Sequence, residues 1–307
     1  MGESAQVKFA IMAHGGAKPV PPGKEQTNLD GVQRALEAGH RILQAGGNAL
    51  DAAEAALRVL EDDPAFNAGY GSSLNENREV QMDAAMMNGE DLQIGAVGFV
   101  QGVKHPISVA RTILKKEYTL ITGKGAHKYA EEQGLELCDN DSLITEEQIK
   151  KLQDKQKGNN TVGCVALDQK GNLVAATSTG GLTGCPEGRV GDSPLAGCGF
   201  YAENAVGAVV LSGDGEEIMR YRLASRIMEK LATVGPEIAV SSLVREMHER
   251  VGGEAGGLVL SPQGEYGWFH NSSHFPCAII TSEMKEPRVY LKKSEEKEQE
   301  EKIHAQP

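Results

Sequence analysis

A strand that begins at Thr161, directly after a long polar segment, is the feature that most constrains this chain. Residues 135–160 are rich in charged and polar side chains and lack sustained apolar periodicity. Two apolar runs follow, 161–167 and 173–179, and the polar residues 168–172 between them are typical of a β-hairpin turn. The predicted strand therefore begins directly after a polar segment, where the fold would tolerate a cut in the backbone.

A cut between Asn160 and Thr161 would give Thr161 a free α-amine beside its own hydroxyl. An α-amine has a pKa of about 7.7–8.0, so near neutral pH part of it is unprotonated and can accept the hydroxyl proton. A threonine inside the chain has no such base of its own. Such a cut would therefore make Thr161 a candidate nucleophile that carries its own base. The structural alternative is an ordinary threonine at a strand start.

The second strand of the predicted hairpin ends in Thr177-Ser178-Thr179, which runs back beside Thr161. A hydroxyl at this end can hydrogen-bond the nucleophile and position it, and we assign that role to Thr179. The alternative is a pair of threonines packed on one face of a sheet.

A glycine-rich turn, 188–194, contains Arg189 and Asp192. An α-amino-acid head group carries a carboxylate and an ammonium close together. A guanidinium fork binds the first and a carboxylate binds the second. The pair therefore predicts a clamp for an amino-acid head group, and the alternative is a surface ion pair.

The sequence Ser212-Gly213-Asp214-Gly215 follows a predicted strand and precedes a predicted helix. Backbone N–H groups at such a turn point outward, and Ser212 adds a hydroxyl donor. This arrangement suits the oxyanion that forms when a carbonyl is attacked. The alternative is an ordinary connection between a strand and a helix.

Composition and charge exclude several other classes of function. The net charge of −12 and the absence of a long basic patch before the tail argue against nucleic acid or an anionic membrane as partners. No apolar run is long enough to span a membrane, and the polar start of the chain is unlike a signal peptide, so we expect a cytoplasmic protein. Five cysteines without CxxC spacing agree with reduced thiols. His270 and His274 lack a third ligand motif nearby, so no metal site is predicted.

The periodicity predicts an α+β chain in which antiparallel sheets are covered by helices. The length alone allows one large domain or two smaller ones. The composition predicts a mobile linker with a short helix over 135–160 and a disordered, charged tail over 292–307. The predicted helices span roughly 29–43, 48–60, 105–115, 125–133, 216–231 and 236–251, and Asn48 is the predicted N-cap of the second. The predicted strands span roughly 7–13, 80–87, 94–100, 161–167, 173–179, 206–211, 257–261, 266–269, 278–281 and 288–291.

Several motifs occur in an order that resembles one family, the isoaspartyl peptidase and plant-type L-asparaginase family of N-terminal nucleophile hydrolases, with the human asparaginase-like type as the nearest branch. The resemblance covers roughly residues 7 to 290. The motifs that carry it are His14-Gly15-Gly16-Ala17, residues 60–69, Met82-Asp83-Ala84, Thr161-Val162-Gly163, residues 177–181 and residues 188–194.

The resemblance implies a single domain with a four-layer αββα sandwich. It also implies that the chain cuts itself between Asn160 and Thr161, into an α subunit, 1–160, and a β subunit whose ordered part is 161–291. It implies that Thr161 is the nucleophile, assisted by Thr179. It places the oxyanion at Ser212 and Gly213, with Asn67 nearby. Further residues expected to line the substrate site are Arg189, Val190, Gly191, Asp192, Asp214 and Gly215.

The resemblance also implies a dimer of αβ units and no cofactor. A structural sodium ion in the loop from Leu60 to Tyr70, held by backbone carbonyl groups, is the one ion that it suggests. The expected partners are small substrates, namely asparagine and β-aspartyl dipeptides, from which L-aspartate would be released.

Two residues depart from the family pattern. Asn160 stands where the family usually has glycine, and a side chain there narrows the backbone freedom at the scissile bond, so we expect slower processing. Ser212 stands where the family usually has threonine, and serine is less restricted in its rotamers. Two alternative functions remain at this point. One is a glycosylasparaginase-type amidase, although that branch usually has asparagine where this chain has Gly180. The other is an unprocessed, inactive relative that binds ligands.

Overall fold

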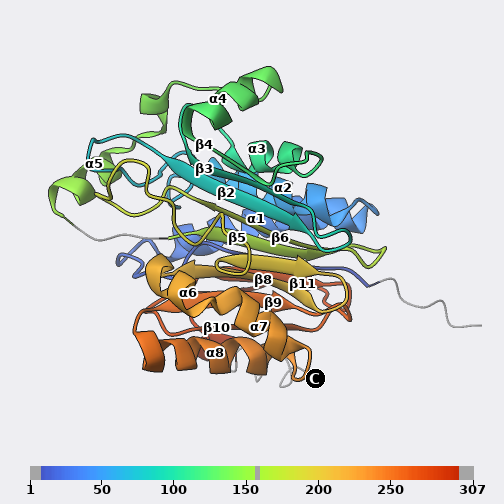
Figure 1. Ribbon diagram of the computed structural model, residues 1–307. Helices are drawn as coiled ribbons and strands as arrows, with labels where there is room; N and C mark the ends of the chain where they lie inside the picture. Colours follow the sequence, from blue (N-terminus) through green and yellow to red (C-terminus); the bar gives the residue numbers. More distant parts are fainter. Residues whose placement is uncertain (1–7, 156–159, 297–307) are drawn as a thin grey trace, which may run out of the picture.

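Two β-sheets lie face to face at the centre of the structure, and helices cover both outer faces (Figure 1). The computed structural model describes residues 8–155 and 160–296. The order of the layers is helix, sheet, sheet, helix, which confirms the predicted α+β class and the four-layer αββα sandwich.

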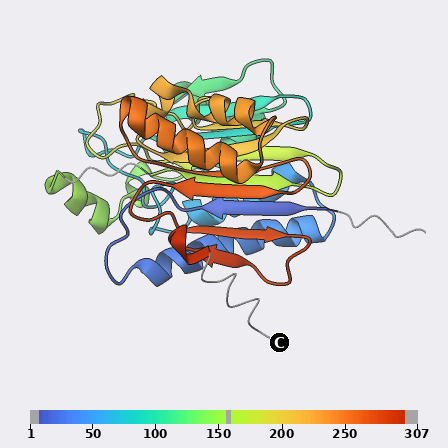
Figure 2. The same cartoon turned by 90° about the horizontal axis from the view of Figure 1, so that it is seen from below.

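Among the described residues, the larger sheet has eight strands, and only its β3–β4 pair is parallel. The N-terminal strand lies between strands from the second half of the chain, as Figure 2 shows from below. The order across the sheet is β12 (Arg288–Tyr290), β11 (Cys277–Thr281), β1 (Ala10–His14), β5 (Val162–Leu167), β6 (Leu173–Thr179), β2 (Met82–Asn88), β3 (Ile94–Val100) and β4 (Leu120–Thr122).

The smaller sheet is antiparallel throughout and comes entirely from the second half of the chain. The order across it is β10 (Tyr266–His270), β9 (Ala255–Leu260), β8 (Gly207–Gly213) and β7 (Phe200–Glu203). Its strand β8 ends at Gly213, so the predicted turn 212–215 joins this sheet to the helix that follows.

The helices divide between the two outer faces. The larger sheet carries α1 (Glu25–Gln44), α2 (Ala49–Glu61), α3 (Pro106–Ile113) and α4 (Gly123–Glu132), and the smaller sheet carries α6 (Gly215–Tyr221), α7 (Leu223–Leu231) and α8 (Pro236–Val251). As predicted, Asn48 caps α2, because its side chain accepts a hydrogen bond from the N–H of Asp51 at 2.8 Å.

The two-residue period of the strands decides which side chains meet between the sheets. In β5, Val162 and Cys164 pack under the helices, whereas Val165 packs between the sheets. By the same alternation, Thr161 and Thr179 face the gap between the sheets, where β8 lies. This is how two residues from a central hairpin come to meet the end of a strand of the other sheet.

The predicted helix 216–231 is wrong in one respect, because the structure has two helices there. Arg222 separates α6 from α7 and has φ 53° and ψ 50°, the left-handed conformation. Apolar periodicity continues across this break, so spacing alone does not reveal it. The sequence prediction also missed the short strands β4 and β7.

The segment 135–160 contains the short helix that the sequence predicts, but its described residues pack on the domain, unlike the expected mobile linker. Residues 140–143 form a 3₁₀ helix, η1 (Asn140–Leu143), and α5 (Glu146–Gln153) follows. Leu143 and Gln148 are buried, and the Gln148 amide donates to the carbonyl of Gly71 at 2.7 Å. The segment therefore packs on the domain as far as the description extends, and residues 156–159 lie outside the described residues.

The predicted disordered tail 292–307 also begins with attached residues. Lys293 pairs with Glu237 at 2.9 Å, and Trp268 donates its indole N–H to Glu296 at 2.8 Å. Residues 297–307 lie outside the described residues. Across the described ranges, no helix combines the length and the apolar character needed to cross a membrane.

The crossing of α1 and α2 gives a test of the packing. A Cβ at Gly39 would lie 2.7 Å from the carbonyl oxygen of Ala52 and 2.3 Å from Cδ1 of Ile11. We expect Gly39→Ala to destabilise the protein by about 1–3 kcal/mol, because the Ala52 backbone cannot yield. Gly125→Ala is the control, since nothing lies within 4 Å of its Cβ in α4, and it should stabilise slightly. Equal melting temperatures for the two variants would contradict this packing.

Candidate active site

The peptide bond between Asn160 and Thr161 is the centre of the site. Its carbonyl oxygen, on Asn160, accepts a hydrogen bond from Nδ2 of Asn67 at 2.9 Å and one from Oγ1 of Thr179 at 2.6 Å. Two donors fixed on one carbonyl oxygen stabilise the negative charge that develops there when the carbonyl carbon is attacked. This peptide bond is therefore activated by geometry.

Both donors are held by the fold. Thr179 is the last residue of β6, and that strand pairs with β2 through Asp83. Asn67 lies in the loop after α2, where its Oδ1 accepts from the N–H of Ser73 at 2.6 Å and its Nδ2 also donates to Gly181 at 2.8 Å. The amide group therefore has one orientation, and it directs its N–H at Asn160.

Thr161 is almost fully buried, and both its amide and its hydroxyl are engaged. Its Oγ1 lies 2.6 Å from Oγ of Ser193, and its N–H donates to Oγ of Ser212 at 3.1 Å. Ser212 Oγ also accepts from the N–H of Ala17 at 3.1 Å. The hydroxyl of Thr161 thus sits beside another hydroxyl, next to the carbonyl that Asn67 and Thr179 hold.

The turn after β1 packs closely against this peptide bond. Gly16 has φ +106°, and a Cβ there would lie 2.9 Å from Cβ of Asn160. A Cβ at Gly163 would lie 2.3 Å from Nε2 of His14, so that position also excludes a side chain. Burial lowers the pKa of His14 to about 3, although the main chain of Thr161 offsets part of this, so the imidazole beside the bond is neutral.

The predicted clamp residues come from one loop and have different partners. Arg189 pairs with Glu216, with 2.8 Å between Nη2 and Oε1. Asp192 is 4% exposed, and its Oδ2 has no hydrogen-bond partner among the described residues. Burial raises the pKa of Asp192 to about 7, and the charge of Arg189 lowers it in part. A buried carboxylate oxygen without a donor suits the ammonium of a ligand.

Asp83 lies beneath the clamp loop and was missed as a site residue. Its Oδ2 accepts from the N–H of Gly191 at 3.2 Å, and its Oδ1 accepts from the N–H of Phe99 at 2.8 Å. Burial raises the pKa of Asp83 to about 6, whereas these two hydrogen bonds and Arg189 lower it. The sequence signal for Asp83 was a single carboxylate inside an apolar strand. A buried charge needs hydrogen-bond partners, and here it finds one of them in the clamp loop.

The structure brings most of the predicted residues to one small cavity of about 10 Å³. A space of that size holds about one water molecule, so an amino acid does not fit while the chain is uncut. The residues that line it are Asn160, Thr161, Thr179, Gly181, Arg189, Gly191, Asp192, Ser193, Gly213 and Gly215.

The other predicted residues lie around this cavity without lining it. Ser212 and Asn67 act through the hydrogen bonds described above. Val190 is half-buried between Arg189 and Gly191 in the clamp loop. Asp214 is the N-cap position of α6, and its Oδ2 accepts from the N–H of Glu254 at 2.8 Å.

Two contacts differ from what the sequence predicts. Thr179 bonds the carbonyl of Asn160, not the hydroxyl of Thr161. The partner of that hydroxyl is Ser193, which the sequence reasoning did not single out. The available signal was a hydroxyl directly after Asp192 in a glycine-rich turn.

The chain was compared with known proteins. A family model described as asparaginase matches residues 7–160 and 152–289. The isoaspartyl peptidase/L-asparaginase of Rattus norvegicus is 39% identical over 293 residues, which cover 90% of this chain and 87% of that protein. The protein of the same name in Homo sapiens is 41% identical over 285 residues, covering 88% and 92%. That of Xenopus laevis is 38% identical over 296 residues, covering 92% and 96%.

The buried carboxyl of Asp192 gives a pH-dependent prediction. Since its folded pKa lies above its usual value of 3.8, the folded state keeps a proton that the unfolded state loses, and stability falls as pH rises from about 4 to 7. In a Thr161→Ala background, expected to stay uncut, adding Asp192→Asn should raise the melting temperature by a few degrees at pH 8. The gain should shrink at pH 5. A lower melting temperature at pH 8 would show that the carboxylate is well solvated or paired.

Proposed function

Because the chain belongs to the asparaginase family, we propose that it is a hydrolase that cuts itself between Asn160 and Thr161 and then releases L-aspartate from L-asparagine and from β-aspartyl dipeptides. The observation that carries this proposal is the Asn160 carbonyl, with its two side-chain donors and the buried hydroxyl of Thr161 on the same peptide bond. The names of the similar proteins supply the two substrate classes.

The first reaction matures the chain. Oγ1 of Thr161 attacks the carbonyl carbon of Asn160, while Asn67 and Thr179 hold the oxygen that becomes negative. The bond between this carbon and the nitrogen of Thr161 then breaks, and that nitrogen takes the hydroxyl proton. Water hydrolyses the resulting ester, which leaves a carboxylate on Asn160 and a free amine and hydroxyl on Thr161.

The second reaction uses the residue that the first one exposes. The amine of Thr161 accepts the proton of its own hydroxyl, which attacks the side-chain carbonyl of the substrate. The amine then protonates the leaving nitrogen, and water releases aspartate from the ester on Thr161. The oxyanion is assigned to Ser212 and Gly213, with Asn67 nearby. Thr179, which loses the Asn160 carbonyl as acceptor, becomes available to the Thr161 hydroxyl.

The clamp binds the part that both substrates share. Arg189 would exchange the carboxylate of Glu216 for the α-carboxylate of the substrate, and Asp192 would accept from the α-ammonium. Glu216 is half exposed on its side chain, so the exchange releases it into solvent. Val190, Gly191, Asp214 and Gly215 shape the loops around this head group. Removal of the Asn160 end after the cut provides the missing space.

The glycosylasparaginase alternative expects asparagine where this chain has Gly180. A Cβ at Gly180 would lie 2.4 Å from Cβ of Ser72 and 2.6 Å from Oδ1 of Asn67, so this site has no room for that side chain. This close contact favours the asparagine and β-aspartyl substrates.

The assembly, the ion and the location also belong to the proposal. We assign the protein to the cytoplasm and expect a dimer of αβ units. The loop from Leu60 to Tyr70 closes through its own main chain, since the carbonyl of Glu61 accepts from the N–H of Tyr70 at 2.7 Å. A carbonyl oxygen keeps a second lone pair, and a structural sodium ion in this loop would be held through such main-chain oxygens. No step of either reaction requires it.

Replacing Thr161 tests the nucleophile directly. Thr161→Ala removes the hydroxyl, so we expect a single full-length band on a denaturing gel and no release of aspartate or ammonia. Thr161→Ser is the matched control, because it keeps a hydroxyl, and it should still be cut and turn over substrate. Normal turnover by Thr161→Ala would show that this mechanism is wrong.

The donors on the Asn160 carbonyl are tested by the rate of cutting. Asn67→Ala and Thr179→Val should each slow the appearance of two fragments by about 10²–10³-fold, the usual effect of losing one oxyanion donor. The control is Asn77→Ala. Asn77 is an exposed asparagine ten residues after Asn67, so this variant should be cut at the normal rate. A time course on a denaturing gel measures all three. Unchanged cutting in both donor variants would remove the observation on which the proposal rests.

A further inference from the structure

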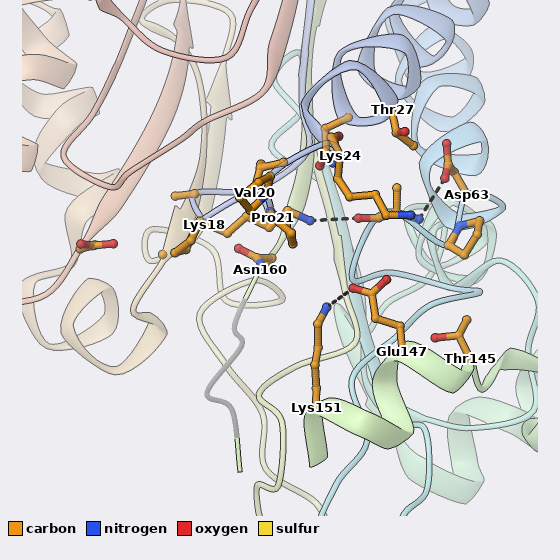
Figure 3. Close-up of a pocket in the computed structure, with 18 of the residues that line it drawn as sticks. Lys18, Val20, Pro21, Lys24, Thr27, Asp63, Thr145, Glu147, Lys151 and Asn160 are labelled. Atoms are coloured by element: carbon orange, nitrogen blue, oxygen red, sulfur yellow. Dashed lines mark hydrogen bonds and ion pairs between the residues drawn. The ribbon is translucent and has the colours of Figure 1, made fainter. Parts of the chain in front are cut away.

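A second, much larger pocket lies on the other side of Asn160, with a volume of about 720 Å³ (Figure 3). Asn160 and Gly213 line both this pocket and the small cavity at the clamp. The two spaces therefore meet at the scissile bond, and release of the Asn160 end would join them. With the head group of a substrate on Arg189 and Asp192, its leaving group would point into the larger pocket.

The size of the pocket is informative about the leaving group. Hydrolysis of asparagine releases ammonia, which needs no pocket. Hydrolysis of a β-aspartyl dipeptide releases a whole amino acid, whose side chain and α-carboxylate need surroundings of matching chemistry. One wall of this pocket is apolar and comes from two loops, with Pro19, Val20, Pro21, Pro22, Pro64 and Ala65.

Lysines line the pocket beside this wall, and their partners differ. Lys151 pairs with Glu147 at 2.7 Å. Lys18 forms no ion pair within the described ranges, and its Nζ donates to the carbonyl of Ala65 at 2.9 Å. An ammonium has three donors, so two remain on Lys18 for a ligand. Asp63, which also lines the pocket, is already paired with Arg34 at 2.6 Å.

The position of Lys18 relates it to the reaction. It follows Ala17, whose N–H bonds the same Ser212 hydroxyl that accepts from the N–H of Thr161. Burial lowers the pKa of Lys18 to about 8, with a smaller contribution from Lys151, whereas Glu147 and Asp63 raise it, so near pH 7 most of Lys18 is protonated. The carboxylates of Asp214 and Glu254 line the pocket too, and they disfavour an anion near them.

We propose that this pocket binds the leaving residue of a β-aspartyl dipeptide, with Lys18 pairing with its α-carboxylate and the proline-rich wall contacting an apolar side chain. The proposal rests on the proposed function and adds a preference within it. The favoured substrates are β-aspartyl dipeptides whose second residue is apolar and has a free carboxylate. L-Asparagine, which has no second residue, does not reach Lys18.

The test compares β-aspartyl-leucine, β-aspartyl-leucine amide and L-asparagine, with rates normalised to the cut fraction of each protein. We expect the wild type to favour the free acid over the amide by about tenfold in kcat/KM, as for a hydrogen bond to a charged group. Lys18→Met should abolish that preference and lower the ratio of β-aspartyl-leucine to asparagine turnover by about tenfold. Lys18→Arg, which keeps the charge, should preserve both.

Lys24→Met is the matched control, because Lys24 is an exposed lysine at the same pocket, and it should change either ratio by less than about twofold. An acid-to-amide preference that survives in Lys18→Met, or is absent from the wild type, would overturn the assignment of Lys18. Wild-type turnover of asparagine separates the two failures. If asparagine and dipeptides are both left intact by fully cut protein, the proposed function itself fails.

Discussion

The carbonyl oxygen of Asn160, held between Asn67 and Thr179, is the interaction on which the rest of the structure depends. The hairpin of β5 and β6 brings Thr179 beside Thr161, and the loop after α2 brings Asn67 from the first half of the chain. The small sheet contributes Ser212 at the end of β8. Three parts of the fold, namely the loop after α2, β6 and β8, thus contact one peptide bond, and no single element could position it alone.

Burial of charge around this bond is what prepares the site for a ligand, at a cost to stability. Burial raises the pKa values of Asp192, in the clamp loop, and of Asp83, beneath that loop. On the helix side of β6, the hydroxyl of Ser178 donates a hydrogen bond of 2.6 Å to the carboxyl of Glu61. Burial raises the pKa of Glu61 as well, and the nearby His105 lowers it in part. Binding sites for charged ligands commonly contain buried charged groups of this kind, which lower the stability of the fold. Here the ligand itself would supply the missing counter-charge on Asp192.

Local signals in the sequence predicted much of this fold. The hairpin at 161–179, the cap at Asn48 and the bounds of α8 follow from turn residues, side-chain capping and apolar spacing, which act over a few residues. Arg222 was not predictable, because its left-handed conformation leaves the apolar pattern intact. The contact between Ser193 and Thr161 joins residues 32 apart in the chain, so only the assembled sheets reveal it.

The most direct test of this account is N-terminal sequencing of the two fragments in freshly purified, active protein. The account predicts that the smaller fragment begins Thr-Val-Gly-Cys, the sequence that starts at Thr161. Activity in a chain that is never cut, or a fragment that begins at any other residue, would contradict it.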